Sequence, residues 1–380
     1  MLMVIGNGNR NGKSNSNDNG GNNNTNDDGN VNCYSRLGRF IRLLRNFSTT
    51  KKNDFKVTLI GCCGGIGQPL ALLLKRHELI STLALYDLAK TPGVHTDLSH
   101  IDTKACLEGF QCRENLPPAL ENADVVILSA GLPRKPDMTR DDLFVKNIDI
   151  VLEIAAAIGE HCPKALFGII TNPVNSCVPA AAEILKQKNS FDPKRLFGIT
   201  TLDGVRARTF IGRILDVEPC KVNIPVIGGH SGETIIPVIS QCKPPLKLDK
   251  EQRAKLIKQI QEAGTDVVTA KSPDGGTSAT LSMAHAAEVF TNSLLQGLKG
   301  DCQPVQCSYV ASDVTDCAYF STPLQFGKNG IEKNLGLPKL DKDEEDMVCK
   351  AMEMLKNNIK KGVDYAKNNN AKMDKKDKKC

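Results

Sequence analysis

The sequence of 380 residues is long enough for two domains, or for one large domain with a tail. Hydrophobic residues make up 40% and charged residues 24%, an ordinary globular balance, and no run approaches the ~18 apolar residues of a membrane span. The net charge of +6 comes from basic segments near the two ends, so the chain offers no basic face for nucleic acid. The 14 cysteines lack a CxxC pair or a zinc-type Cys/His spacing, so we expect a reducing compartment and no metal site.

The N-terminal part of the chain differs in composition from the rest. Residues 1–35 are rich in Asn, Gly, Ser and Asp, which predicts a disordered segment. Residues 36–52 carry arginines and lysines without any acid, and their apolar residues fall at helical spacing: Leu37, Phe40, Ile41 and Leu44. This pattern is typical of a mitochondrial transit segment, which predicts a matrix protein. A surface helix or a membrane-surface anchor is the alternative, and the protein is then cytoplasmic.

Apolar runs alternate with helical patterns after residue 53. Runs at 55–61, 81–87, 123–131 and 165–172 predict strands, and 139–159 predicts one of the helices between them. Such alternation favours parallel βαβ units with helices on both faces of the sheet. We therefore predict an α/β protein whose N-terminal half is a Rossmann-type, doubly wound parallel sheet over residues 53–175.

The pattern changes in the second half, where helices mix with shorter strands such as 222–228. Helices are expected at 250–270, 278–297 and 342–366. Residues 176–366 are therefore predicted to form a mixed α+β domain, for which the acid–base residues described below suggest the substrate and catalytic role. Residues 367–380 are rich in lysine and are predicted to be a disordered tail.

The segment GCCGGIGQPL, at 61–70, follows the first strand and opens the first helix. Its glycines allow a tight turn and a close approach of backbone to a pyrophosphate, which binds at a helix N-terminus. The residues expected to bind a dinucleotide here are Gly61, Gly64, Gly65, Ile66 and Gly67. A tight turn without a ligand is the alternative. The neighbouring Cys62 and Cys63 are interpreted as small residues that fill the turn, and the alternative is an oxidisable thiol of lowered pKa at the helix N-terminus.

Asp87 ends the second strand, 26 residues after Gly61. A carboxylate there accepts hydrogen bonds from an adenosine ribose and repels a 2′-phosphate, so it favours NAD over NADP as the cofactor. The alternative is an exposed aspartate at the end of a strand. Together with the glycine-rich turn, Asp87 predicts that residues 53–175 are an NAD-binding domain.

Candidate acid–base chemistry lies in the second half. His230 stands between glycines at the end of an apolar run, either as a structural residue or as a catalytic base. Asp203 and Arg206 are helical neighbours, so they form either a surface ion pair or an imidazole partner and a carboxylate-binding arginine. Asn172, in TNPVN, follows the fourth strand where α/β sheets bind ligands, although Asn-Pro is also a turn signal and a candidate cis peptide.

A basic loop, GLPRKPDMTR at 131–140, contains a glycine and two prolines, so it cannot be a regular helix or strand along its length. Its three cations outnumber its single acid, Asp137. A solvated surface loop is the ordinary explanation. The other explanation is a lid that closes over a small anionic ligand.

Several motifs in sequence order resemble the NAD-dependent malate dehydrogenase family, in its mitochondrial-type branch. They are GCCGGIGQPL, LYDLAKTPGVHTDLSH, GLPRKPDMTRDDLF, TNPVN, LDGVRA, GGHSG, SATLSMA and YFSTPLQFGKNGIEKNLG. The resemblance implies NAD, a dicarboxylate substrate, a homodimer, and reversible oxidation of (S)-malate to oxaloacetate. It implies that His230 is the proton acceptor and that Asp203 is its partner.

The resemblance also implies roles for the remaining site residues. Arg134, Arg140, Asn172 and Arg206 bind substrate, Arg140 also acts in catalysis, and Asn147, Asn172 and Met283 contact the cofactor. Because the similar lactate dehydrogenases lack an arginine at the position of Arg134, this residue indicates a second substrate carboxylate. The chain departs from the family pattern at four places: Cys62 and Cys63, Asp137, Gly204 and Glu288.

Two other functions fit parts of the pattern. A lactate or other 2-hydroxyacid dehydrogenase shares the acid–base pair, but Arg134 argues against it. A non-catalytic dinucleotide-fold protein, acting through its tail or its N-terminal segment, needs none of the site residues. Neither nucleic acid nor a membrane is an expected partner.

Overall fold

The computed structural model describes residues 54–134, 138–274 and 277–376, apart from the side chains of Arg140, Asp274 and 370–376. The predicted N-terminal segments, Asp137 and the last four residues of the tail lie outside the described residues. All described residues belong to one compact unit, Lys52–Cys380.

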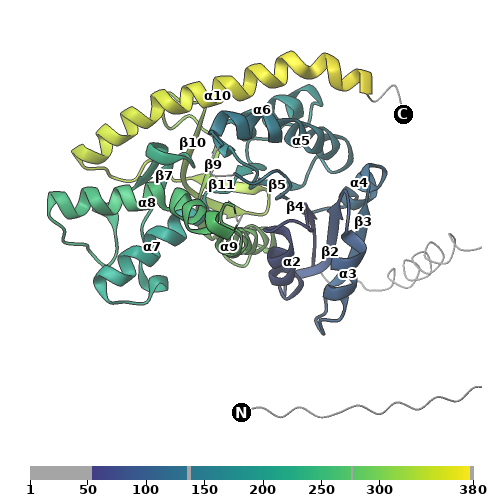
Figure 1. The fold of residues 1–380 in the computed structure, drawn as a ribbon, viewed down its shortest axis with the longest axis horizontal. Coiled ribbons are helices and arrows are strands. Elements are labelled where there is room, and N and C mark those ends of the chain that lie inside the picture. Colours follow the sequence, from purple (N-terminus) through teal and green to yellow (C-terminus); the bar gives the residue numbers. More distant parts are fainter. Residues whose placement is uncertain (1–53, 135–137, 275–276, 377–380) are drawn as a thin grey trace, which may run out of the picture. The chain divides into compact units, whose positions relative to one another are not determined.

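The first half alternates strands and helices along the chain, as predicted (Figure 1). Its elements are β1 (Phe55–Ile60), α2 (Gly67–Lys75), β2 (Ile80–Asp87), α3 (Thr91–Ser99), β3 (Cys106–Gln111), α4 (Leu116–Leu120), β4 (Val125–Leu128), α5 (Arg140–His161), β5 (Leu166–Ile169), α6 (Val174–Gln187) and β6 (Leu196–Gly198). These strands pair in parallel in the order β3-β2-β1-β4-β5-β6. That order is the one of Rossmann dinucleotide-binding folds, and it confirms the predicted fold class.

The strands of the parallel sheet are buried on both faces because helices cover each side. Val57 and Leu59 of β1 pack in an apolar core with side chains of α2 and α9, whereas Ile60 packs in the core that contains α5 and α6. Continuous apolar strands are typical of such doubly covered parallel sheets. The carboxyl ends of β1, β4 and β5 lie at one edge, and the glycine-rich turn, the basic loop with Arg134, and Asn172 follow them in the chain.

The second half extends the same sheet with antiparallel strands. Its elements are α7 (Thr201–Leu215), β7 (Val226–Gly228), β8 (Ile235–Pro237), α8 (Lys250–Lys271), α9 (Leu281–Lys299), β9 (Val305–Ala311), β10 (Tyr319–Gly327), β11 (Gly330–Asn334) and α10 (Lys342–Lys376). β9 pairs with β6 and β10, and β10 also pairs with β7 and β11. The predicted strand 222–228 is shorter than expected, since β7 starts only after Pro225, which has no N–H to donate.

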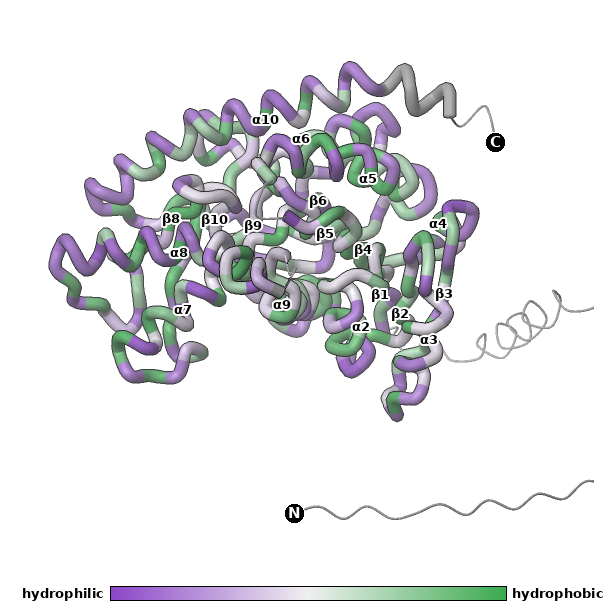
Figure 2. The backbone as a smooth tube through the Cα atoms, in the orientation of Figure 1, coloured by the Kyte–Doolittle hydropathy of each residue, from purple (hydrophilic) through white to green (hydrophobic). Residues whose placement is uncertain are grey.

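Helix α10 lies along α6 (Figure 1), and it reaches α5 through Tyr365, whose ring packs edge-on against Phe144. Figure 2 shows that it is mostly hydrophilic with recurring hydrophobic bands. Its buried apolar residues include Val348, Ala351 and Leu355. At Gly362 the helix approaches α6 so closely that a Cβ would lie 2.1 Å from the carbonyl oxygen of Ser176. The helix continues to Lys376, into the segment predicted as a tail, and that extension contains no proline or glycine.

Candidate functional site

The glycine-rich turn between β1 and α2 is built from glycines with different physical roles. Gly61 has a φ of 88°, and a Cβ there would lie 2.5 Å from the backbone nitrogen of Ala130. A Cβ on Gly67 would lie 1.9 Å from the carbonyl oxygen of Gly61, so this glycine lets helix and strand pack closely. Gly64 and Gly65 instead line a cavity, where the absence of a side chain leaves room for a ligand.

Gly67→Ala is expected to lower the free energy of unfolding by about 3 kcal/mol, because the new methyl group meets backbone that cannot move aside. Helix propensity alone predicts the opposite sign, since alanine is the better helix former. Gly64→Ala is the matched control, because its Cβ meets only the Gly61 oxygen at an ordinary 3.4 Å. Denaturant unfolding of both variants measures the difference, and equal midpoints would contradict this account of the turn.

Asp87 holds the glycine-rich turn from the end of β2. Its Oδ2 accepts the N–H of Cys63 at 2.9 Å, and its Oδ1 accepts the N–H of Leu88 at 2.8 Å. Asp87 is not among the residues that line the cavity, so the structure brings it to the turn rather than into the cavity. The predicted contact with a ribose stays a prediction.

A histidine–carboxylate pair lies deep in the second half. His230 Nδ1 is 2.6 Å from Asp203 Oδ2, and the side chains of the two residues are only 10% and 1% exposed. An ionised carboxylate can only accept, so Nδ1 carries the proton and Nε2 is left as a free acceptor. The surface ion pair that was the alternative for Asp203 is thereby excluded, because Asp203 is buried.

The backbone around His230 is fixed by residues that the sequence analysis did not single out. Asn175 Oδ1 accepts the N–H of His230 at 2.9 Å, and its amide nitrogen lies 3.2 Å from Asn358 Oδ1 on α10. A Cβ on Gly229 would lie within 3.0 Å of three side-chain atoms, one of them on Asn175. The motif TNPVN contained Asn175, but nothing local indicated that it would reach a histidine 55 residues later.

Arg206 and Arg134 line the same cavity as His230, although they come from different parts of the chain. Arg206 is 13% exposed, and its Nη1 lies 4.0 Å from Asp203 Oδ1. Burial lowers the pKa of Arg206, and the carboxylates of Asp203 and Asp266 oppose that shift. Arg134 Nε donates to the carbonyl oxygen of Met138 at 3.3 Å. The two cations therefore face one space of about 550 Å³.

Arg140 begins α5, directly after the loop. The N-terminus of this helix is defined by a capping box in which Thr139 and Asp142 exchange hydrogen bonds. The side chain of Arg140 lies outside the described residues, so its predicted role stays a prediction.

Two asparagines meet at the carboxyl ends of β4 and β5. Asn147 bonds the backbone of Leu132 through its Oδ1 at 2.7 Å, and its amide nitrogen donates to the carbonyl oxygen of Asn172 at 2.9 Å. Asn147 therefore ties the start of the basic loop to the Asn172–Pro173 peptide, which is cis, as the sequence suggested. Among the described residues, Asn172 Oδ1 is buried without a hydrogen-bond partner, and its residue lines the cavity, so it is available to a ligand.

The cavity therefore collects most of the predicted site residues. It is lined by Gly64, Gly65, Ile66, Arg134, Asn147, Asn172, Asp203, Arg206, His230 and Met283. It also includes residues that were not predicted, among them Thr171, Gly264 and Thr280. Gly61, Gly67 and Asp87 do not line the cavity. The two glycines allow the tight packing of the turn, and Asp87 holds the turn by a hydrogen bond.

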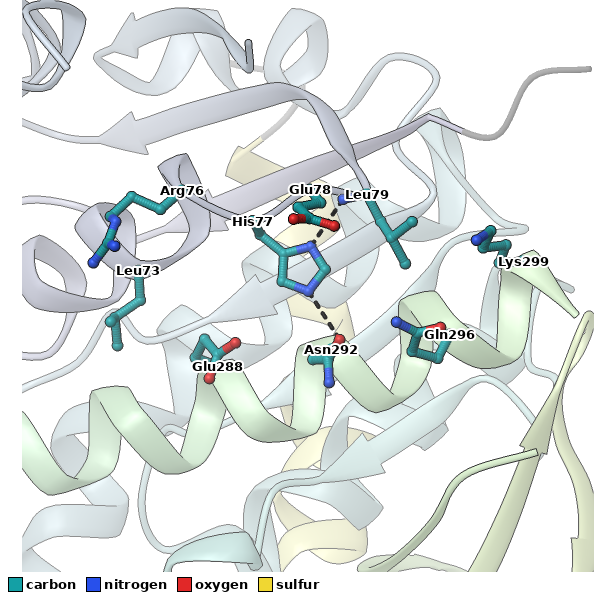
Figure 3. A pocket seen from close by; sticks show the side chains of 9 residues that line it. All are labelled: Leu73, Arg76, His77, Glu78, Leu79, Glu288, Asn292, Gln296 and Lys299. Carbon is teal, nitrogen blue, oxygen red and sulfur yellow. Dashed lines mark hydrogen bonds between the residues drawn. The ribbon is translucent and has the colours of Figure 1, made fainter. Parts of the chain in front are cut away.

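A second cavity, of about 480 Å³, lies between α2 and α9 (Figure 3). His77 Nδ1 accepts the N–H of Leu79 at 3.1 Å, so its Nε2 donates to Asn292 Oδ1 at 3.0 Å. Glu288, one of the departures from the family pattern, lines this cavity beside charges of both signs. Both ring nitrogens of His77 therefore have hydrogen-bond partners, which is typical of a structural histidine.

No helix within the described part of the chain is long and apolar enough to span a bilayer. The fold defines a class, the dinucleotide-binding α/β proteins, and the cavity adds a histidine–carboxylate pair and two arginines. Residues 55–198 match the family model for the lactate/malate dehydrogenase NAD-binding domain, and residues 200–366 match the model for the alpha/beta C-terminal domain of the same family. The predicted domain boundary, after residue 175, stays a prediction.

Curated relatives cover nearly the whole described chain. The mitochondrial malate dehydrogenase of Felis catus is 53% identical over 326 residues, which is 86% of this chain and 96% of the relative. The mitochondrial malate dehydrogenase of Homo sapiens is 52% identical over 325 residues, with the same shares covered. This chain belongs to the lactate/malate dehydrogenase family, in the branch of the mitochondrial malate dehydrogenases, and NAD is its cofactor.

Solved structures agree with this membership. The malate dehydrogenase of Cryptosporidium parvum matches with a TM-score of 0.71 at 28% identity and covers 81% of this chain and 99% of its own. The lactate dehydrogenase of Eimeria maxima, solved with NADH and oxamate, matches with a TM-score of 0.71 at 25% identity and covers 85% of this chain and 98% of its own.

Proposed function

We propose that this chain is an NAD-dependent malate dehydrogenase, which interconverts (S)-malate and oxaloacetate by hydride transfer. One observation carries the proposal: the His230–Asp203 pair, at 2.6 Å, lines the same cavity as Arg134 and Arg206. The relatives, about half identical over nearly their whole length, support malate as the substrate.

The residues at the carboxyl edge of the parallel sheet fit NAD. Gly64 and Gly65 line the cavity without side chains, and the unpartnered Asn172 Oδ1 offers a buried acceptor. In this proposal Met283 and Asn147 lie beside the nicotinamide, and Asp87 receives the adenosine ribose. NAD, when bound, accepts the hydride from the substrate carbon and returns it in the reverse direction.

His230 moves the proton in this mechanism. Because its Nδ1 donates to Asp203, its Nε2 is free to take the proton of the malate hydroxyl. The resulting imidazolium is stabilised by the buried carboxylate of Asp203. In the reverse direction the charged His230 protonates the oxygen that was the carbonyl of oxaloacetate.

The arginines recognise the two ends of the substrate. Arg206 forms a two-pronged pair with the carboxylate next to the reacting carbon, and Arg134 binds the far carboxylate. Arg140 stabilises the negative charge that develops on the carbonyl oxygen. The basic loop closes over the site and excludes water, which strengthens each of these interactions. This explains the excess of cations at 131–140.

The assay that tests the function follows NADH absorbance after addition of oxaloacetate to the purified full chain. We expect rapid oxidation of NADH with oxaloacetate and far slower oxidation with pyruvate. A lactate dehydrogenase, the runner-up, would show the reverse preference. A chain that oxidises NADH with neither substrate would be a non-catalytic member of the fold.

Assembly and location are also proposals. We expect a homodimer. Three large apolar side chains are exposed on α2, α7 and α9, namely Leu72, Ile214 and Leu281, and they support the expectation that a second copy covers part of this surface. We expect the mitochondrial matrix, which the mitochondrial relatives support. Sedimentation analysis and N-terminal sequencing of the protein isolated from mitochondria test these two expectations.

A further inference from the structure

Two neighbouring cysteines in the glycine-rich turn bring their sulfur atoms together. Cys62 Sγ and Cys63 Sγ are 3.7 Å apart, although side chains of adjacent residues in an extended strand point to opposite faces. The tight turn after β1 causes this convergence. Both cysteines are departures from the pattern of the family that the chain resembles, so the NAD site itself does not require them.

A third ligand atom comes from a distant part of the chain. Ligand atoms of Cys62, Cys63 and Asp87 all lie within 4.8 Å of one another, which is the only such group of cysteine, histidine and acidic residues in the part of the chain that the structure describes. Each carboxylate oxygen of Asp87 accepts one backbone N–H and keeps a further lone pair. These backbone bonds orient the carboxylate in the way that outer hydrogen bonds orient metal ligands.

The spacing of the sulfurs agrees with one class of cation. Zn–S bonds of about 2.3 Å at a tetrahedral angle put two thiolates about 3.8 Å apart, close to the observed 3.7 Å. We propose that Cys62, Cys63 and Asp87 form a site for a thiophilic divalent cation of the zinc class, and that its occupation excludes NAD. A water molecule completes the four ligands, as in zinc sites with three protein ligands.

The occupied site carries a net negative charge, which suits its position at the start of a helix. The cation displaces one proton from each thiol to solvent, so two thiolates and one carboxylate around a divalent cation carry a net charge of −1. The N-terminus of α2, a helix of nine residues, favours such a charge. Burial raises the pKa of both thiols, which is opposite to the lowered pKa that the alternative of an oxidisable thiol required.

The exclusion of NAD rests on the proposed function. Asp87 is the proposed partner of the adenosine ribose, and the turn at 64–65 is the proposed place of the pyrophosphate. A bound cation engages Asp87 and leaves a negative charge beside the pyrophosphate. Metal and cofactor are therefore expected to compete.

The first measurement uses the full chain, stripped with a chelator and kept reduced with a phosphine. Cadmium is titrated while the ultraviolet charge-transfer band of cadmium thiolate is followed, and zinc affinity is measured by calorimetry. We expect one equivalent of cadmium with two thiolates in the parent protein. The band is lost in C62A/C63A and is kept in C106A/C220A, which removes two exposed cysteines elsewhere.

A second variant keeps the test independent of the cysteine substitutions. Asp87→Asn should weaken zinc binding by about tenfold or more, since it removes the charged oxygen ligand. In the presence of zinc, the apparent Kd for NADH, measured by fluorescence, should rise at least tenfold in the parent protein and stay constant in C62A/C63A.

Either of two results would overturn the proposal: equal cadmium binding by the parent and C62A/C63A, or an NADH affinity that zinc does not change. The metal titration requires no cofactor or substrate, so its failure is distinguishable from failure of the proposed function. The latter is tested by the oxaloacetate assay on the metal-free protein.

Discussion

His230→Asn is expected to lower kcat for malate oxidation by about 10²–10⁴-fold, the usual contribution of a general acid–base group. Asparagine keeps a polar side chain of similar size, so the hydrogen bond between the backbone N–H and Asn175 should survive. It cannot take a proton from the substrate hydroxyl. NADH affinity should remain near that of the parent protein, because the substitution leaves the glycine-rich turn, the proposed place of the pyrophosphate, unchanged.

The measurement pairs steady-state kinetics with NADH fluorescence titration. His161→Asn is the matched control, because His161 lies in the last turn of α5 and only approaches Glu160, at 3.9 Å. Near-normal turnover in the His230 variant would end the assignment of His230 as the base. Loss of NADH binding together with turnover would instead indicate a folding defect.

Arg134→Gln is expected to lower kcat/KM for oxaloacetate by about 10²–10³-fold. Loss of one partner of a charge pair in a closed site costs about 3–4 kcal/mol, and each 1.36 kcal/mol is a factor of ten. Pyruvate has a methyl group in place of the second carboxylate, so its kcat/KM should be unchanged or higher. The ratio of the two substrates therefore shifts toward pyruvate.

Arg113→Gln is the matched control for Arg134, since its side chain is 62% exposed and contacts only Glu153 within salt-bridge distance. It removes the same charge from the surface and should leave both substrates unaffected. An unchanged substrate ratio in Arg134→Gln would remove the support for a second carboxylate. The preference for malate over lactate would then need another residue.

Local sequence patterns were sufficient to predict those strands whose own residues make them recognisable. The apolar runs of β1, β2, β4 and β5 are continuous and largely buried, so their composition alone predicted them. β3 was missed because it is an edge strand with a half-exposed pattern. β10 was missed because Pro323 interrupts its apolar run, and a proline argues against a central strand.

The sequence was enough to predict which residue types form the site, but not which of these residues contact one another. Asp203 and Arg206 looked the same from the sequence whether they formed a surface ion pair or a buried site. Burial of Asp203 to 1% exposure decided between the two. Arg134 and Met283 were assigned to the site only through the family resemblance, because no local signal connects either residue to His230.

The class of sheet, the glycine-rich turn and the chemical types of the candidate residues follow from the amino-acid order, because each depends on neighbours within one or two elements. The folded chain was needed to show that His230 meets Asp203, that Arg134 and Arg206 share a cavity, and that Asp87 lies beside Cys62 and Cys63. The reason is physical: these contacts join residues far apart in the chain, and they form only when the sheet and its helices bury their apolar faces together.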